Sequence, residues 1–267
     1  MVPYVRMRSR RATEALLVFS LSAAAAILFT YPLAFELDHV GRVNTDDGRW
    51  SIWVVSWVAR TLVVDPRHLF EANIFYPHHD TLAYSENNLG AGLLAIPVYW
   101  ATRNPYAAHN FVVLVAFTLS VVGMYYLAKR LTADRGAAAV AAITFAFCPY
   151  VFSRTPHIQL LITAGLPFSM LAFHALVERP TPGRGVLLGF ALIATGLTCG
   201  YYGVFVGLMV GLGTLVYATS QHRWRDRQYW LAIAIAAALT VAVMGFLFLP
   251  YRRVQIETGF ARSLGEA

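Results

Sequence analysis

Two adjacent carboxylates, Asp46 and Asp47, are the residues of this sequence best suited to chemistry. An ionised carboxylate can take a proton from a hydroxyl group, and it can also bind a metal ion. The pair precedes a tryptophan-rich segment, so a simpler interpretation is that one carboxylate caps a helix there. Capping by one residue does not exclude catalysis by the other, and a general base or a metal ligand is expected at this pair.

A second polar group follows in the same stretch of chain. His78, His79 and Asp80 could bind a divalent metal ion, although their spacing matches no metal signature and loop packing is the simpler interpretation. The sequence therefore leaves a divalent metal cofactor open. Glu86 and the nearby Tyr84 are better candidates for contacts with a substrate.

Three polar residues, Arg154, His157 and Gln159, stand at the start of a later apolar segment. Charged groups close to a bilayer are costly and tend to be functional. Arg and His side chains can hold a lipid phosphate through charge-assisted hydrogen bonds, although Arg154 could also simply extend to the headgroups. These three residues are predicted to bind substrate.

The elements that position these residues must be membrane helices. The 267-residue chain is 58% hydrophobic and 13% charged, with a mean hydropathy of +0.54. A soluble domain carries roughly 25% charged residues. The predicted fold class is therefore an all-α polytopic membrane protein. The net charge of +7 is explained by bases that flank the spans, and no nucleic-acid partner is expected.

Apolar windows predict a single module with about seven transmembrane helices. The predicted spans are residues 13–35, 107–128, 136–152, 157–177, 185–199, 201–219 and 229–250. The polar loop 36–103 holds eight of the 14 acidic residues, the bundle occupies 104–250, and 251–267 begin an external tail. Lys and Arg in the short loops place the N-terminus in the cytoplasm and loop 36–103 outside. A bacterial inner or plasma membrane is the predicted location.

Two helices along the membrane surface are predicted within the external loop, at residues 47–64 and 90–102. In the first, Trp50, Trp53 and Trp57 recur at i, i+3 and i+7, which places the three indoles on one face. Tryptophan prefers the headgroup level, where its ring is buried and its N–H stays hydrated. The second surface helix is expected to break near Pro97.

This order of features resembles the GT-C class of membrane glycosyltransferases, which take sugars from polyprenyl-phosphate carriers. The resemblance covers essentially the whole chain and rests on the order of features. The matching features are Asp46-Asp47, the tryptophan-rich helix, Asn73-Ile74-Phe75-Tyr76-Pro77, Asn104-Pro105, Asn110, Phe145-Ala146-Phe147-Cys148-Pro149-Tyr150 and His157-Ile158-Gln159.

The resemblance implies transfer of a sugar from a polyprenyl-phosphate donor to an acceptor on the outer face. Asp46 or Asp47 is then the catalytic base, and Arg154 and His157 neutralise the leaving phosphate. Some members of the class use a divalent metal and others do not. Members usually carry further spans and often a C-terminal soluble domain, and the motif here is Asp-Asp-Gly-Arg rather than a plain acidic pair.

Two alternative functions accompany this prediction. One is a non-catalytic scaffold or assembly subunit with the same bundle, and the other is a lipid or polysaccharide transporter. A transporter is expected to carry ionisable or helix-breaking residues near the bilayer centre, whereas the spans here are nearly free of charge. The lipid-linked donor and membrane lipids are the expected partners, and protein partners are left open.

Overall fold

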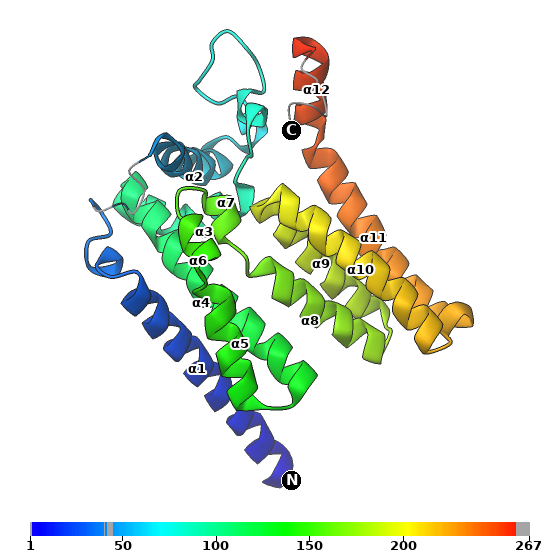
Figure 1. The fold of residues 1–267 in the computed structure, drawn as a ribbon. Coiled ribbons are helices and arrows are strands. Elements are labelled where there is room, and N and C mark those ends of the chain that lie inside the picture. Colours follow the sequence, from blue (N-terminus) through cyan, green and yellow to red (C-terminus); the bar gives the residue numbers. More distant parts are fainter. Residues whose placement is uncertain (1, 40, 42–44, 260–267) are drawn as a thin grey trace.

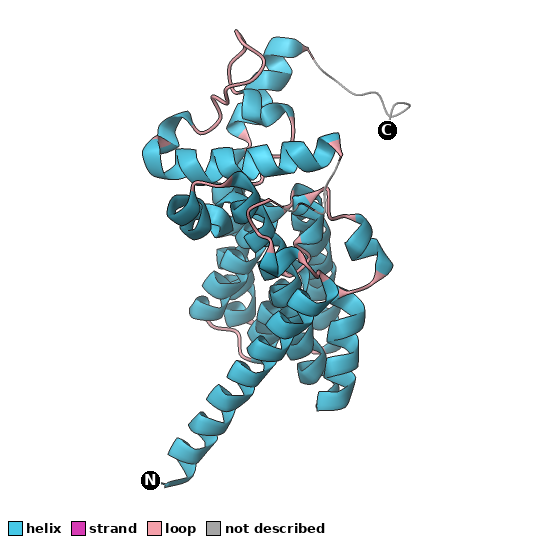
Figure 2. Ribbon diagram, turned by 90° about the vertical axis from the view of Figure 1, so that its left-hand side faces the viewer, coloured by secondary structure: helices cyan, strands magenta, loops and turns pink. Residues whose placement is uncertain are grey.

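The computed structural model describes residues 2–39, 41 and 45–259, with side chains described from residue 12 onward in these ranges. Every regular element in this described part is a helix, and the same residues form no strand (Figures 1 and 2). The predicted all-α fold class is therefore confirmed.

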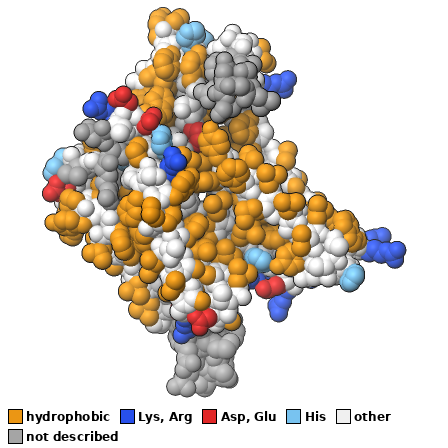
Figure 3. All heavy atoms as spheres, viewed as in Figure 1, with side chains coloured by type: hydrophobic (Ala, Val, Ile, Leu, Met, Phe, Trp, Pro, Cys, Tyr) orange, Lys and Arg blue, Asp and Glu red, His pale blue; other side chains and the backbone are white. Residues whose placement is uncertain are grey.

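Five segments within the described ranges are long and apolar enough to cross a membrane. They are the apolar part of α1 (Val2–Phe29), α4 (Pro105–Thr132), α5 (Arg135–Ala146) together with α6 (Pro149–Ser153), α10 (Gly200–Ser220) and α11 (Arg227–Leu247). Many of their apolar side chains are exposed, and hydrophobic side chains dominate much of the face seen in Figure 3. Such large exposed apolar surfaces are typical of contact with lipid. The chain is thus an integral membrane protein.

The predicted count of seven spans is not confirmed. Residues 157–177 divide into α7 (Ile158–Leu161) and α8 (Gly165–Glu178), because Ile162 leaves the helical conformation. The hydroxyl groups of Thr163, in this break, and Ser120 of α4 form a 3.0 Å hydrogen bond. This bond fixes the non-helical segment against α4. The next predicted span is α9 (Pro182–Thr198), which has 17 residues.

The first predicted span is also shorter than expected. Helix α1 ends at Phe29, and a short 3₁₀ helix, η1 (Leu33–Phe35), follows it. Pro32 lies between them, and because proline has no backbone N–H it cannot continue the hydrogen-bond ladder of α1.

Helix α2 (Asp46–Val64) lies across the long helices. It is seen end-on in Figure 1 and lengthwise in Figure 2. Its N-cap is Thr45, whose hydroxyl accepts a 3.1 Å hydrogen bond from the Gly48 N–H. Asp46 and Asp47 occupy the first turn instead of the cap, so the capping alternative is wrong for both. Their charge there still suits the positive end of the helix dipole.

The tryptophan face of α2 packs against protein. The indoles are half-buried and pack with an apolar cluster that includes Leu69, Leu82 and Leu89. The Trp57 indole N–H donates to the Leu69 carbonyl at 3.0 Å, which replaces the contact with water expected at the headgroup level. The segment after α2 therefore covers the face that was predicted to meet the membrane interface.

Helix α3 (Leu89–Thr102) continues through Pro97, so the predicted break there is wrong. It links α2 to the end of α9 through two close glycine contacts. A Cβ on Gly92 would lie 2.2 Å from the Val58 side chain of α2, and one on Gly90 would lie 2.3 Å from Thr198. Only glycine permits approaches this close without displacing a neighbour. Consequently the residues just before α3 lie beside the junction of α9 and α10.

The chain returns to the same end of the molecule in α12 (Leu249–Thr258). This helix lies beside η3 (Thr81–Tyr84), as Figure 1 also shows. Residues 251–258 belong to the predicted external tail, and this helix is a feature that the sequence did not indicate. Residues 260–267 of that tail lie outside the described residues, as do residues 40 and 42–44 of the predicted external loop.

Candidate functional site

The first turn of α2 faces the loop that precedes α7. His157 Nε2 lies 3.7 Å from Asp47 Oδ2. The Ser51 hydroxyl, one turn further along α2, donates a 2.6 Å hydrogen bond to the Pro156 carbonyl. This bond fixes the start of α2 against the loop. A predicted acid and a predicted phosphate ligand, from distant parts of the sequence, are thus neighbours.

The two adjacent carboxylates have different surroundings. The Asp46 side chain is fully exposed and lies 3.8 Å from Arg49, one turn further along α2. The Asp47 side chain is 68% exposed, so it can reach solvent or a substrate while it contacts His157. Of the predicted pair, Asp47 is therefore the one placed beside a second candidate residue.

Arg154 belongs to the same turn as His157, whose N–H donates to the Arg154 carbonyl at 2.9 Å. The guanidinium lies 5.0 Å from the centre of the Tyr150 ring. Its Nε atom is buried and has no hydrogen-bond partner among the described residues. A buried donor without a partner is costly, and an anionic ligand would satisfy it. Gln159 is half-buried on α7, two residues after His157.

Glu86 lies in a different cleft, just before α3. Its side chain lines a cavity of about 630 Å³ together with Tyr84, Tyr201 and Tyr251, and it also borders a smaller cavity of about 120 Å³ near Cys199. Burial raises the pKa of Glu86 to about 7. A carboxyl group with such a pKa can exchange protons near neutral pH.

Helix α12 forms one wall of this cleft. The Tyr251 hydroxyl accepts hydrogen bonds from the Asn87 backbone N–H at 3.1 Å and from its side-chain amide at 2.9 Å, and it donates to the Ser85 carbonyl at 3.1 Å. Burial raises the Tyr251 pKa to about 12, so this hydroxyl stays protonated. The sequence analysis missed Tyr251. The polar run Tyr251-Arg252-Arg253 directly after the last span was the available signal.

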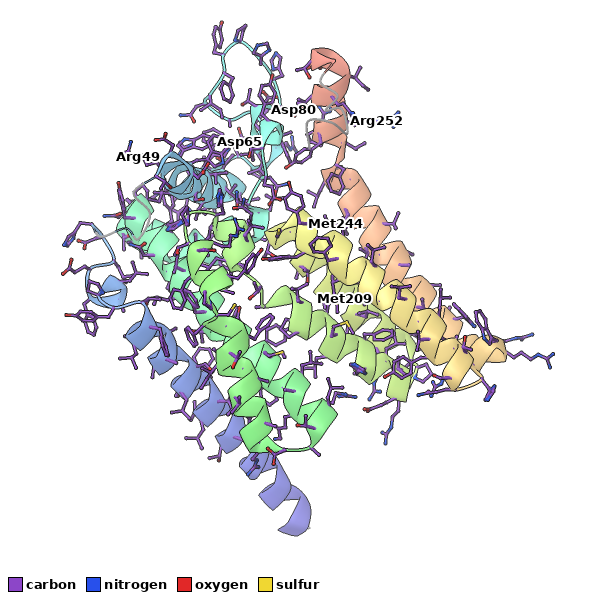
Figure 4. All side chains as sticks on the ribbon, viewed as in Figure 1. Arg49, Asp65, Asp80, Met209, Met244 and Arg252 are labelled. Atoms are coloured by element: carbon purple, nitrogen blue, oxygen red, sulfur yellow. The ribbon has the colours of Figure 1, made fainter. Side chains whose placement is uncertain are left out.

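The three candidate metal ligands do not converge. Asp80 pairs with Arg253 of α12 at 3.2 Å, and Figure 4 shows Asp80 beside that helix. The His79 ring lies 3.3 Å from Glu71, and the His78 ring lies beside Tyr84. No group of three His, Cys, Asp or Glu side chains suited to a metal ion occurs among the described residues.

The predicted site residues thus fall into two groups. Asp47, His157 and Arg154 meet at the junction of α2 and the loop before α7, whereas Glu86 and Tyr84 line the cleft beside α12. The first group combines a carboxylate with a guanidinium and an imidazole, which suits a hydroxyl group next to a phosphate.

The later part of the chain matches a known protein family. The family model described as dolichyl-phosphate-mannose-protein mannosyltransferase matches residues 102–246. This range includes Arg154 and His157 but not the acidic loop that carries Asp47.

Similar curated proteins are bacterial sugar transferases. An undecaprenyl phosphate-alpha-4-amino-4-deoxy-L-arabinose arabinosyl transferase of Pseudomonas aeruginosa strain LESB58 is 33% identical over 137 residues, which is 49% of this chain and 24% of the relative. The second enzyme of that name from Sodalis glossinidius is 30% identical over 133 residues, or 48% of this chain and 24% of the relative. The match thus spans about a quarter of the length of these relatives. No solved structure matches the chain.

Proposed function

Because the chain belongs to the dolichyl-phosphate-mannose-protein mannosyltransferase family, a GT-C family, we propose that it transfers a sugar from a polyprenyl-phosphate donor to an acceptor. The observation that carries this proposal is the 3.7 Å approach of Asp47 to His157. It joins the acidic loop to the loop of Arg154, so one reaction centre can hold both an acceptor hydroxyl and a donor phosphate.

The transfer reaction assigns one role to each residue. Asp47 accepts the proton of the acceptor hydroxyl, and the oxygen attacks the anomeric carbon of the donor sugar. The bond between that carbon and the phosphate oxygen breaks, and polyprenyl phosphate leaves with the bonding electrons. Arg154 and His157 stabilise the charge on the departing phosphate. Gln159, the second residue of α7, is assigned to the same phosphate end.

The donor class follows from two features. The printed names of the relatives refer to an undecaprenyl phosphate-linked sugar. In addition, the buried Nε of Arg154 has no hydrogen-bond partner among the described residues, and a phosphate oxygen could accept its hydrogen bond.

The proposed topology places the reaction on the outer face of a bacterial inner membrane. Helices α2 and α3 lie along that face within the external loop 36–103, and the N-terminus is cytoplasmic by the positive-inside rule. Helices α8 and α9 have 14 and 17 residues and are about 21 and 26 Å long. The bilayer core is about 30 Å thick. We therefore propose that α7 and α8 cross together and that α9 crosses with its flanking residues, which gives seven crossings.

Transfer from a radiolabelled polyprenyl-phosphate sugar in membranes that contain this chain tests the proposal. The Asp47→Asn variant should reduce transfer about 10²- to 10⁴-fold, the usual contribution of a general base. Asp46→Asn is the matched control, since that side chain is fully exposed, and it should stay near the parent rate. Equal transfer by both variants would show that Asp47 is not the general base. Uptake of the sugar into sealed vesicles without transfer would favour a transporter, and donor binding without either activity would favour a scaffold.

A further inference from the structure

The cleft between residues 83–86 and α12 has a chemical character different from that of the Asp47–His157 centre. It has a volume of about 630 Å³, within the usual range for small-molecule sites. Among the residues that the structure describes, its lining combines apolar, aromatic, amide, hydroxyl and carboxyl groups but no Lys, Arg or His. A phosphate or another anion would find no cationic partner there. The cleft therefore suits an uncharged or cationic molecule.

Glu86 is the dominant polar group of this cleft. No hydrogen bond or ion pair to its carboxyl group occurs within the part of the chain that the structure describes. Burial without a partner is costly for a carboxyl group and raises its pKa to about 7, so a ligand that donates hydrogen bonds gains from meeting it. The Gln255 amide of α12 lines the same cleft and adds a donor and an acceptor.

Aromatic rings supply the remaining surface. Tyr84 is 38% exposed and Tyr201 is 61% exposed, and both line the cleft. The Tyr84 ring is stacked on Phe75 with ring centres 5.5 Å apart, which restricts its orientation. An aromatic face next to hydrogen-bonding groups matches a molecule that has an apolar face and a polar rim.

The wall formed by α12 is attached at two points. Tyr251 holds the segment that carries Glu86 through its bonds to Asn87 and Ser85, and Arg253 pairs with Asp80 at 3.2 Å. The cleft is thus built by segments far apart in the chain, which polar contacts hold together. Such preorganised walls reduce the entropic cost of binding a small ligand.

We propose that this cleft binds a neutral or amino sugar ring, with Glu86 and Gln255 bonding its hydroxyl or amino groups and Tyr84 covering its apolar face. The inference rests on the proposed function for the origin of the sugar, which is either the donor or the acceptor of the transfer. The cleft is then a substrate subsite separate from the proposed phosphate-binding group at Arg154.

Saturation-transfer difference NMR with the full chain in lipid nanodiscs tests this proposal without turnover. The probes are methyl glycosides of neutral hexoses, a pentose and an amino sugar, with a methyl glucuronide as the anionic comparison. We expect sugar-ring signals for at least one neutral or amino glycoside and none for the glucuronide. The Glu86→Ala and Gln255→Ala variants should reduce these signals at least about fivefold, which corresponds to the loss of one hydrogen bond. Glu86→Gln should retain much of the signal, since an amide can still bond a hydroxyl group.

Tyr106→Phe is the control, because Tyr106 is also exposed but does not line the cleft. The Asp47→Asn variant should bind the glycosides normally although it loses transfer activity. Failure of the sugar-binding proposal can therefore be distinguished from failure of the proposed reaction. Displacement of the glycoside by farnesyl-phosphate sugar would identify the donor sugar as occupant, and simultaneous binding would identify the acceptor. Absence of signals for every glycoside, or signals that persist in both Glu86→Ala and Gln255→Ala, would overturn the proposal.

Discussion

The imidazole Nε2 of His157 lies 3.7 Å from the Oδ2 atom of Asp47, although α2 and the loop before α7 are separated by two membrane-length helical segments in the chain. The Ser51 hydroxyl holds the same two segments together through the Pro156 carbonyl. Because these two contacts bring the candidate acid and the candidate phosphate ligand together, substitutions of either group should change the rate of transfer.

Replacement of His157 with Gln should reduce the rate of transfer. The substitution keeps a hydrogen-bond donor near Asp47 but removes a group that can become cationic beside the phosphate. We expect kcat to fall about 10²- to 10³-fold, as for the loss of one preorganised electrostatic contact in a reaction centre. Steady-state kinetics with a lipid-phosphate sugar measures this, with His68→Gln as control because His68 pairs with Asp65 on the surface. An unchanged kcat would mean that His157 only supports the fold.

Arg154→Ala should weaken binding of the donor. The side chain has a buried Nε without a partner among the described residues, so a phosphate gains a charge-assisted bond there. Such a bond contributes about 1.5 to 3 kcal/mol, or roughly 10- to 150-fold in affinity. Farnesyl phosphate binding to the detergent-solubilised protein is the measurement. The matched control is Arg49→Ala, since the Arg49 side chain is 70% exposed. Equal losses in both variants would point to a general effect of charge.

Glu86 should make stability depend on pH. Burial raises its pKa to about 7, above the unfolded value near 4.5, so the folded state holds the proton more tightly. Stability should therefore fall as the pH rises from about 4.5 through about 7, and it should change little above that. The neighbouring Cys199 and Tyr251 ordinarily titrate above this range. Glu86→Gln should remove the slope, so its Tm relative to the parent protein should increase between these pH values. A constant difference in Tm would contradict the prediction.

Gly92→Ala should destabilise the contact of α3 with α2. The new Cβ would lie 2.2 Å from the Val58 side chain, and overpacking of this kind costs about 1 to 3 kcal/mol. A lower Tm in detergent is expected, with partial recovery when Val58→Ala is added. Gly207→Ala is the control, because no atom lies within 4 Å of the Cβ that it adds, and it should leave the Tm unchanged or raise it slightly. A similar drop in both variants would mean that the contact with Val58 does not explain the loss of stability.

The sequence by itself determined the helical membrane class and the position of α2. Both depend on local properties: apolar windows long enough for a bilayer, and an amphipathic period that starts after a capping residue. The start of α2 at Asp46 lies one residue from its predicted position, and α3 begins at Leu89 rather than at residue 90. The concentration of acids in one loop was likewise visible without a structure.

Tertiary packing decided which candidate residues meet. It placed Asp47 rather than Asp46 beside His157, paired Asp80 with Arg253, and left Glu86 half-buried without a partner among the described residues. It also interrupted the predicted helix near Ile162 and covered the tryptophan face of α2 with residues 69–89. These outcomes depend on contacts between segments far apart in the chain. Periodicity and hydropathy report which face of a helix is apolar, but they carry no information about which distant segment will cover it.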